Sequence, residues 1–235
     1  MFLSSLEVPY VNERKLSGDA RLATSVRALL DARCLPDGEY PVGRVNSLYF
    51  DTVGLSAYRE KADGDHLKRK VRLRWYGLDG DLPESVPAFL EVKYRVGSAR
   101  HKVRQRLEVP RSLLLETPFG DDSFRTFLAR NGAAVGEPLA AEWTPVVQIS
   151  YDRHRYVDVP SDSRVSVDWN IVAPRFHPER FPLGHPVALD EMVCEYKNEG
   201  GTPPAWLDEL RLMGLRHGSF SKYGACMERL TEGLL

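Results

Sequence analysis

Residues 68–75 (KRKVRLRW) are rich in cations, and from Lys70 to Trp75 basic and apolar side chains alternate. In a β-strand, residues two apart point to the same face, so Lys70, Arg72 and Arg74 would share one face and the apolar residues between them the other. The same spacing recurs in two further sets of cations, Lys102/Arg104/Arg106 and Arg153/Arg155. One such face alone would simply point to water, whereas several faces around one interior would bind a polyanion.

A carboxylate stands two residues before a lysine at three places: Glu13-x-Lys15, Glu91-x-Lys93 and Glu195-x-Lys197. This spacing puts the acid and the amine on the same face of a strand. There the carboxylate can orient the amine, or it can hold a metal ion beside a phosphate that the amine binds. The pattern indicates a phosphorylated ligand.

The number of cations decides how tightly such a ligand would be bound. A triphosphate carries about three to four negative charges, and one contact near 4 Å is worth on the order of 1 kcal/mol in water and about 4 kcal/mol at an intermediate dielectric. A few exposed lysines would bind it weakly, whereas about six to eight enclosed cations would bind it tightly. Because these cations repel one another without ligand, we expect the ligand to stabilise the fold.

Lys222 is a further candidate, because Ser219 would cap a helix and place Lys222 in its first turn. A cation at this end opposes the helix dipole. Beside a bound phosphate, however, the ammonium group and the helix N–H groups would act together. The alternative is an exposed lysine on a helix that begins later, and the sequence leaves both open.

The charge balance argues against a nucleic-acid coat. The chain has 32 basic and 33 acidic residues among 235, a net charge of −1, whereas proteins that coat nucleic acid normally carry a basic excess. No nucleic-acid partner is therefore expected, and any strong positive field must come from segregated charges.

The cysteines and the hydropathy favour a soluble, cytoplasmic protein. Cys34, Cys194 and Cys226 are far apart in the sequence and form no CxxC pair, which is typical of a reducing compartment and not of a zinc site or a disulfide framework. We find no secretory leader and no apolar run of about 18 to 20 residues, so no transmembrane segment is expected.

The common nucleotide-binding and catalytic motifs are missing from the sequence. It contains no GxxxxGK[ST] loop, no GxGxxG before a helix and no HExxH pair. Ser150 and Ser221 lack the GxSxG context of a nucleophile elbow. The cations are therefore the strongest chemical signal in the chain.

The elements that would carry these side chains are strands at 11–16, 44–51, 67–76, 88–96, 100–109, 145–159, 164–172 and 187–198, and helices at 19–32, 54–61, 110–131, 203–213 and 219–230. The 88–96 and 100–109 strands would form a hairpin around Gly97-Ser98. About eight strands without a repeat or a linker favour one α+β domain over residues 1–235, built around an eight-stranded antiparallel barrel with helices packed outside and a helix at the C-terminus. An open two-layer sheet is the alternative.

Eight short motifs follow one another in this order: ERK at 13–15, SLYFDT at 47–52, RLRWY at 72–76, FLEVK at 89–93, SYDR at 150–153, RVSVD at 164–168, EYK at 195–197 and SKY at 221–223. Over about residues 7–230, the chain resembles the VTC domain. That domain is the polyphosphate polymerase module of the triphosphate tunnel metalloenzyme (CYTH-like) superfamily.

The resemblance implies an eight-stranded tunnel that binds the triphosphate of ATP together with Mn²⁺ or Mg²⁺. The phosphate ligands that it implies are Lys15, Arg72, Arg74, Lys93, Arg153, Arg164 and Lys222, and the same strand faces add Lys70 and Lys197. Glu195 would be the main metal ligand, with Glu13 beside it. Related triphosphatases read ExExK in the first strand, but Val11 holds the first glutamate position here, which favours the polymerase branch.

We therefore expect ATP-dependent polyphosphate synthesis, with Arg72, Arg74, Lys93, Arg153 and Arg164 positioning the transferring phosphoryl group and neutralising its charge. A triphosphatase of the same fold, acting on inorganic, nucleoside or thiamine triphosphate, is the first alternative. A non-enzymatic module that binds polyphosphate or inositol phosphates is the second. The sequence predicts neither the oligomeric state, nor the primer, nor the role of the loop at 174–186.

Overall fold

The computed structural model describes residues 12–62, 67–96, 99–136, 139, 142–198, 200 and 202–232. Val11 and the Gly97-Ser98 turn, which the sequence analysis singled out, lie outside these residues. The strands are β1 (Asn12–Asp19), β2 (Leu35–Pro36), β3 (Val42–Asp51), β4 (Leu67–Tyr76), β5 (Ser85–Val96), β6 (Ala99–Pro110), β7 (Thr144–Asp158), β8 (Ser163–Phe176), β9 (Val187–Ala188), β10 (Glu191–Asn198) and β11 (Arg216–His217). The helices are α1 (Ala23–Arg33), α2 (Ser56–Ala62), α3 (Arg111–Leu115), α4 (Asp122–Asn131), α5 (Trp206–Leu212) and α6 (Lys222–Thr231).

The strands form a large antiparallel sheet, and with the helices they give the predicted α+β class. The strand order is β11-β1-β10-β8-β7-β3-β4-β5-β6, with β2 added to β7 and β9 added to β8. The sheet has 11 strands, and within the described residues its order does not return from β6 to β11. A closed eight-stranded barrel is therefore not confirmed. The additional strands β2, β9 and β11 have two residues each, too few to show the alternation by which a strand is recognised in a sequence.

The chain divides into two compact units. The first unit comprises Met1–Val42, Arg153–Trp169 and Asp190–Phe220, and the second comprises Gly43–Asp152, Asn170–Leu189 and Ser221–Leu235. Strands β7 and β8 contribute residues to both. The prediction of a single domain stays a prediction, and each unit is described by itself.

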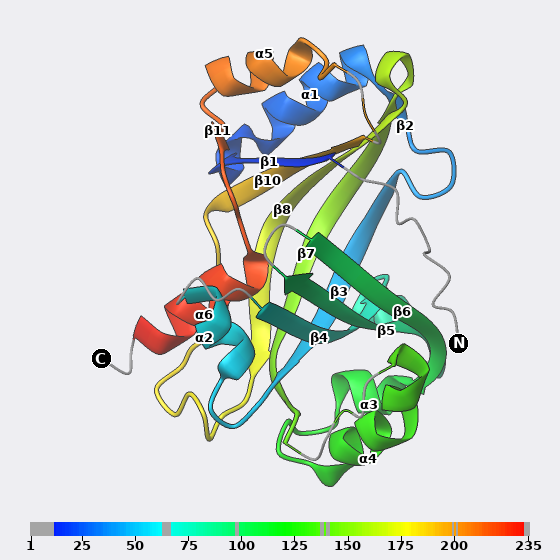
Figure 1. The fold of residues 1–235 in the computed structure, drawn as a ribbon, viewed down its shortest axis with the longest axis vertical. Helices are drawn as coiled ribbons and strands as arrows, with labels where there is room; N and C mark the ends of the chain where they lie inside the picture. Colours follow the sequence, from blue (N-terminus) through cyan, green and yellow to red (C-terminus); the bar gives the residue numbers. More distant parts are fainter. Residues whose placement is uncertain are drawn as a thin grey trace. The chain divides into compact units, whose positions relative to one another are not determined.

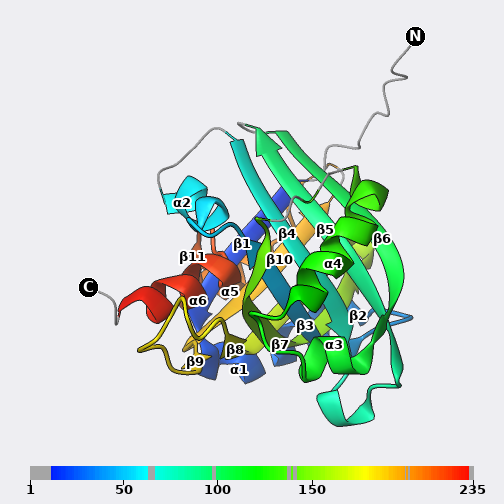
Figure 2. The ribbon, with the colours of Figure 1, turned by 90° about the horizontal axis from the view of Figure 1, so that it is seen from below.

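In the second unit, helices α3 and α4 cover one face of strands β4, β5 and β6 (Figure 2). Leu73 and Trp75 of β4 pack there with Leu90 of β5 and with Phe124 and Leu128 of α4, all buried. These are the apolar residues of the alternating segments. The basic residues between them therefore belong to the opposite face of the same strands.

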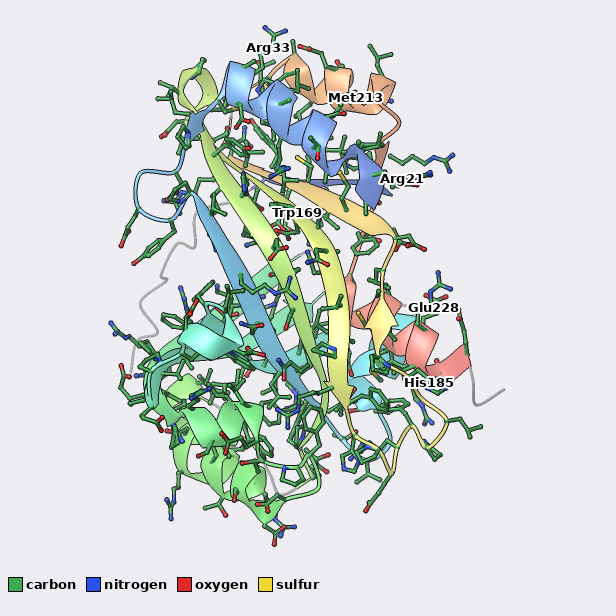
Figure 3. The ribbon with its side chains drawn as sticks, turned by 180° about the vertical axis from the view of Figure 1, so that it is seen from behind. Arg21, Arg33, Trp169, His185, Met213 and Glu228 are labelled. Carbon is green, nitrogen blue, oxygen red and sulfur yellow. The ribbon has the colours of Figure 1, made fainter. Side chains whose placement is uncertain are left out.

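In the first unit, helices α1 and α5 lie side by side over one face of β1 and β10 (Figure 1). Val26 and Leu30 of α1 pack with Leu16 of β1, Cys194 of β10 and Val167 of β8. Figure 3 shows the two helices from behind, with Arg33 on α1 and Met213 after α5. As in the second unit, the helices cover the apolar face, so the charged residues of β1, β8 and β10 lie on the other.

Several predicted boundaries are wrong. The helix expected from residue 19 begins as a 3-10 turn at Ala20–Leu22 and is α-helical only from Ala23. The strand expected at 187–198 is split into β9 and β10, and between them the carbonyl oxygen of Asp190 accepts a hydrogen bond from Ala20 N. The helices that the structure describes are all too short or too polar to span a bilayer.

Candidate functional site: two charged sheet faces

The charged face of the second unit consists of cross-strand rows. Residues directly opposite one another in an antiparallel pair lie on the same face, with Cβ atoms about 4.5–5.5 Å apart. Three of the rows that the registers of β3 to β6 give on this face are Ser47–Arg74–Phe89–Arg106, Tyr49–Arg72–Glu91–Arg104, and Lys70–Lys93–Lys102. The predicted cations of β4 and β5 are therefore brought together, and β6 adds three more.

Arg72 is held between an acid and a phenol in the middle row. Its Nε donates to Glu91 Oε2 at 2.7 Å, and its Nη1 donates to the hydroxyl of Tyr49 at 3.2 Å. Glu91 is buried, and its other oxygen lies 3.4 Å from Lys102 Nζ and 3.4 Å from Arg104 Nε. Burial alone would raise the pKa of the Glu91 carboxyl, but Arg72, Arg74 and Lys102 outweigh it and lower the pKa to about 2. The Glu91 carboxyl is therefore ionised throughout the physiological pH range.

Arg74 is the most deeply buried cation of this face, at 8% exposure. Its Nε donates to Ser47 Oγ at 3.1 Å, and its Nη2 donates to the hydroxyl of Tyr151 on β7 at 3.3 Å. Both partners are neutral oxygens. They fix the direction of the guanidinium group and leave its charge uncompensated by these two contacts, which suits a group that must meet an anion.

Tyr49 reports the electrostatic potential of the rows. Burial disfavours a tyrosinate, yet Arg72, Arg74 and Lys70 together lower the pKa of the Tyr49 phenol to about 8, from an ordinary value of 10. A buried phenol loses its proton this easily only where the surrounding potential is strongly positive. The face therefore favours anions even after Glu91 has offset part of its charge.

The lysine row lies next to the N-terminus of α6. Lys70 Nζ donates to Ser221 Oγ at 3.1 Å, and the same oxygen caps the helix by accepting from Gly224 N at 3.1 Å. Lys222 is the first residue of α6, and its ammonium nitrogen lies 4.5 Å from the centre of the Tyr151 ring. Lys222 is thus in the first turn, as predicted, but the cap is Ser221 and not Ser219.

Within the second unit, buried contacts with β3 hold helices α6 and α2 in place. The hydroxyl of Tyr223 donates to Asp51 Oδ2 at 2.6 Å, and the same carboxylate accepts from the backbone N–H groups of Thr52, Ala57 and Tyr58. The ring of Tyr223 also stacks on Tyr49, with centroids 4.8 Å apart. The helix start that carries Lys222 is therefore anchored to the same strand as Tyr49.

The charged face of the first unit alternates acids and bases along β1, β10 and β8. Its rows are Glu13–Lys197–Arg164 and Lys15–Glu195–Ser166. Lys15 Nζ lies 3.0 Å from Glu13 and 3.7 Å from Glu195, and Glu195 also pairs with Lys197 at 2.5 Å. Burial would raise the pKa of the Glu195 carboxyl, but Lys197, Lys15 and Arg153 overcome it and hold this pKa far below its usual range.

Arg153 has a buried acidic partner that the sequence analysis did not assign. Its Nε and Nη2 donate to the two oxygens of Asp168 at 2.5 and 2.7 Å, a bidentate pair. Asp168 is fully buried. Arg164 is exposed and belongs to the same row as Lys197. The next basic residue of β7, Arg155, donates to the backbone oxygen of Tyr40 at 3.0 Å.

A metal ion would find two carboxylates in the first unit and no complete protein cage. Among the described residues, no group of three or more His, Cys, Asp or Glu side chains is close enough to hold a metal. Glu13 and Glu195 both contact the ammonium group of Lys15. A hard divalent cation such as Mg²⁺ is commonly held by one or two carboxylates together with substrate phosphates and water, so these two glutamates fit that kind of site.

The structure thus divides the predicted residues between its two units. The second unit holds Lys70, Arg72, Arg74, Lys93 and Lys222, and the first holds Glu13, Lys15, Arg153, Arg164, Glu195 and Lys197. The arginines have four partners that were not predicted: Tyr49, Tyr151, Asp168 and Glu91. The signal for Glu91 was present in the Glu-x-Lys spacing. The other three lie in recognisable motifs, but only the strand register shows which cation each one meets.

Two surface hollows lie elsewhere. One of about 700 Å³ is beside α5 and β11, and one of about 610 Å³ is bounded by β6, α3 and α4. Neither is lined by a predicted site residue. The charged rows therefore remain the candidate site on chemical grounds.

Comparisons with known proteins agree with this picture of the fold. The chain is similar to a solved candidate adenylyl cyclase from Hippeastrum that is described as having a dominant triphosphatase activity, with 14% identity, a TM-score of 0.51 and coverage of 93% of this chain and 95% of that one. It is also similar to a candidate adenylate cyclase from Bacillus halodurans, with 12% identity, a TM-score of 0.50 and coverage of 89% and 92%. At these identities the likeness concerns the fold alone. No curated protein matches the sequence.

The VTC domain profile matches residues 3–231, nearly the whole chain. The predicted family is confirmed. The chain belongs to the VTC domain family.

Proposed function

We propose that this chain is an ATP-dependent polyphosphate polymerase. The observation that carries the proposal is the charged face of the second unit. Its lysine row and its arginines are paired by register, and they create a potential positive enough to lower the pKa of the Tyr49 phenol to about 8. Rows of cations at the spacing of adjacent strands suit a ligand that repeats its negative charge, such as a chain of phosphates.

The reaction transfers the γ-phosphoryl group of ATP to the end of the growing chain. A terminal phosphate oxygen of the chain forms a new bond to Pγ, the bond between Pγ and the β,γ-bridging oxygen breaks, and ADP leaves with that electron pair. The acceptor is already an anion, so no side chain has to remove a proton from it. The protein must align the two anions and offset their charge, which accounts for most of the catalysis in phosphoryl transfer.

The arginines and lysines have different parts in this proposal. Arg72 and Arg74 of the second unit are fixed by Glu91, Ser47 and Tyr151, so they would hold the phosphate oxygens in a defined direction. The lysines Lys70, Lys93 and Lys222 would neutralise charge. In the first unit, Lys15, Arg153, Arg164 and Lys197 are proposed as further phosphate ligands.

Mn²⁺ or Mg²⁺ would be held by Glu195 and Glu13, and when bound it would supply Lewis-acid stabilisation of phosphate charge. The chain's own contribution is to keep the Glu195 carboxylate ionised. Lys15 lies beside both glutamates, and Lys197 and Arg153 add to the field at Glu195.

A triphosphatase of the same fold is the second candidate. It is favoured by the described triphosphatase activity of the Hippeastrum protein. Water would then replace the phosphate chain as the acceptor at Pγ. The same cations would serve both reactions, so only the product separates them.

The test is a product assay on the full chain with ATP and either Mn²⁺ or Mg²⁺. The proposal predicts polyphosphate that lengthens with time together with one ADP per phosphate added, and Arg74→Ala or Lys93→Ala should abolish it. Arg130→Ala, which removes an exposed cation of α4 on the helix side of β4–β6, is the matched control and should keep full activity. Orthophosphate without chain lengthening would favour the triphosphatase, and ligand binding without turnover would favour a binding module.

Tyr49 offers an independent measure of phosphate binding. An anion bound to the rows offsets the cations that favour the tyrosinate, so tripolyphosphate should raise the pKa of this phenol from about 8 toward 10. The ultraviolet difference spectrum of tyrosinate measures this shift, and Tyr49→Phe identifies the signal. If the tyrosinate titration near pH 8 is the same with and without tripolyphosphate, the anion is not bound at these rows.

We also propose that the reaction takes place in the cytoplasm. All three cysteines are buried, and none of them forms a disulfide bond. Burial raises the pKa of the Cys34 thiol to about 12, which keeps it protonated and unreactive. Cysteines without a disulfide bond are typical of proteins from reducing compartments.

A further inference from the structure

We propose that Tyr76 and Phe89, at one end of the charged face of the second unit, form a stacking platform for the nucleobase of the nucleoside triphosphate. This inference rests on the proposed function and deepens it. It places the nucleoside at the Tyr76–Phe89 end of β4 and β5, and it places the phosphate chain further along these strands, toward the lysine row.

The two aromatic residues belong to the same strand face as the cations. Phe89 lies directly opposite Arg74 and Arg106 in the first row. Tyr76 is two residues beyond Arg74 on β4, and its ring meets Phe89 edge-on with centroids 6.1 Å apart. An aromatic pair therefore adjoins the row that holds the most buried guanidinium of the face.

These side chains remain accessible because they lie on the face opposite the helix-covered core. Tyr76 is 38% exposed, and Phe89 is half-buried. The Arg104 guanidinium carbon lies 3.5 Å from the centre of the Phe89 ring, so a planar cation already stacks on one face of that ring. A nucleobase is likewise flat and apolar on its faces, and it stacks on aromatic rings and on arginine planes alike.

The next two rows of the face suit phosphates better than a base. Moving two residues along a strand advances about 6.7 Å, so the arginine–glutamate row and the lysine row follow the aromatic end in two such steps. The third row consists of Lys70, Lys93 and Lys102. A run of ammonium groups suits phosphates and offers no surface for a base. The phosphates would therefore extend from Arg74 toward the lysines.

The platform contacts a base by its faces and not by its hydrogen-bonding edge. Its members supply two rings and one guanidinium plane. Stacking of this kind tolerates any base. We therefore expect ATP and GTP to bind with similar affinity, and we expect inorganic tripolyphosphate to gain nothing from the platform.

The experiment compares ATP with inorganic tripolyphosphate as ligands of the full chain, by titration calorimetry. Tyr76→Leu and Phe89→Leu remove a ring and keep an apolar side chain. Each should weaken ATP about 5- to 150-fold, the equivalent of about 1–3 kcal/mol per stacked base. Tripolyphosphate affinity should hardly change. Tyr76→Phe should restore ATP affinity, and Tyr40→Leu, an exposed tyrosine of the first unit, should leave both ligands unaffected.

Three results would overturn the platform: equal loss of both ligands in the leucine variants, no loss of either, or a wild-type chain that binds tripolyphosphate but not ATP. The test is the ratio of the ATP and tripolyphosphate affinities, measured in folded protein. A variant that merely loosens the sheet would lower both affinities, and that result would contradict the platform. The proposed function is decided separately by the product assay. A chain that makes no polyphosphate can still show the ATP-selective loss.

Discussion

Replacing Lys93 by methionine should stabilise the ligand-free protein, although it removes a proposed ligand. Lys93 is the centre of the lysine row, directly opposite Lys70 on one side and Lys102 on the other. Like charges at directly opposed positions destabilise a sheet, and charged cross-strand pairs are worth roughly 0.2–1 kcal/mol each. Two such pairs are relieved, so Lys93→Met should raise the free energy of unfolding by about 0.5–2 kcal/mol. Methionine keeps the length and the apolar stem of the side chain.

Salt and ligand should both change this result. The Debye length falls from about 10 Å at 0.1 M to 3 Å at 1 M, so the gain should shrink as salt is raised. With tripolyphosphate present the gain in stability should be offset or reversed, because the loss of one cation contact costs on the order of 1–3 kcal/mol, about 5- to 150-fold in Kd.

Urea unfolding at low and high salt, with and without tripolyphosphate, measures all four states. Arg130→Met makes the same charge change on α4 and should give no salt-dependent gain. Destabilisation of Lys93→Met at low salt without ligand, combined with unchanged binding, would refute the idea that the row is a strained anion site.

Three further predictions concern the partners of the cations. Glu91→Gln should destabilise the protein by on the order of 3 kcal/mol at pH 7, because it leaves Arg72 partly buried beside a neutral group. The pKa of Glu91 is lowered to about 2 from 4.5, so this stabilisation is complete above about pH 4.5, and the difference from wild type in unfolding experiments should vanish as the pH falls toward 2. Arg153→Lys should lower stability by about 1–3 kcal/mol, since a single ammonium cannot replace the two parallel bonds to Asp168, and equal melting temperatures would contradict this. Tyr223→Phe should raise the KM for ATP more than it lowers kcat, because the lost hydroxyl anchors the helix that carries a proposed phosphate ligand; a loss confined to kcat would argue against anchoring.

The alternation of side chains predicted most of what positions the site. Residues 67–76 were expected as a strand and form β4 with the same bounds. The apolar residues that alternate with its cations, including Leu73 and Trp75, were expected to be covered by helices, and they lie in the core beneath α3 and α4. This worked because a strand has a period of two and one face of it must be buried, so a basic face opposite an apolar one is a local property of the sequence.

The partners of the cations were not predictable in the same way. That Arg72 meets Glu91 and Tyr49, and that Arg153 meets Asp168, depends on the register between strands that are distant in the chain. Register is set by the packing of the whole sheet and not by the pattern of one strand. The same reason explains why the closure of the sheet was over-predicted. Counting alternating segments gives neither the strand order nor the two-residue strands that the sheet also contains.

Arginines and lysines are held differently on these two faces, and the difference bears on how a polymer could be handled. Arg72 and Arg153 each donate hydrogen bonds to the carboxylate of a buried acid, so the planes of their guanidinium groups are fixed before any ligand binds. Each pairing lowers the local charge, and yet the phenol of Tyr49 still loses its proton at about pH 8. The positive potential that remains at Tyr49 comes chiefly from Arg72, followed by Arg74 and Lys70. Lysine is a point charge on a flexible stem and accepts phosphate oxygens from many directions, whereas a fixed guanidinium fork accepts them from few. A reaction that repeats at one place while its product grows needs both properties: rigid cations where the bond is broken and made, and mobile ones where successive phosphates must pass.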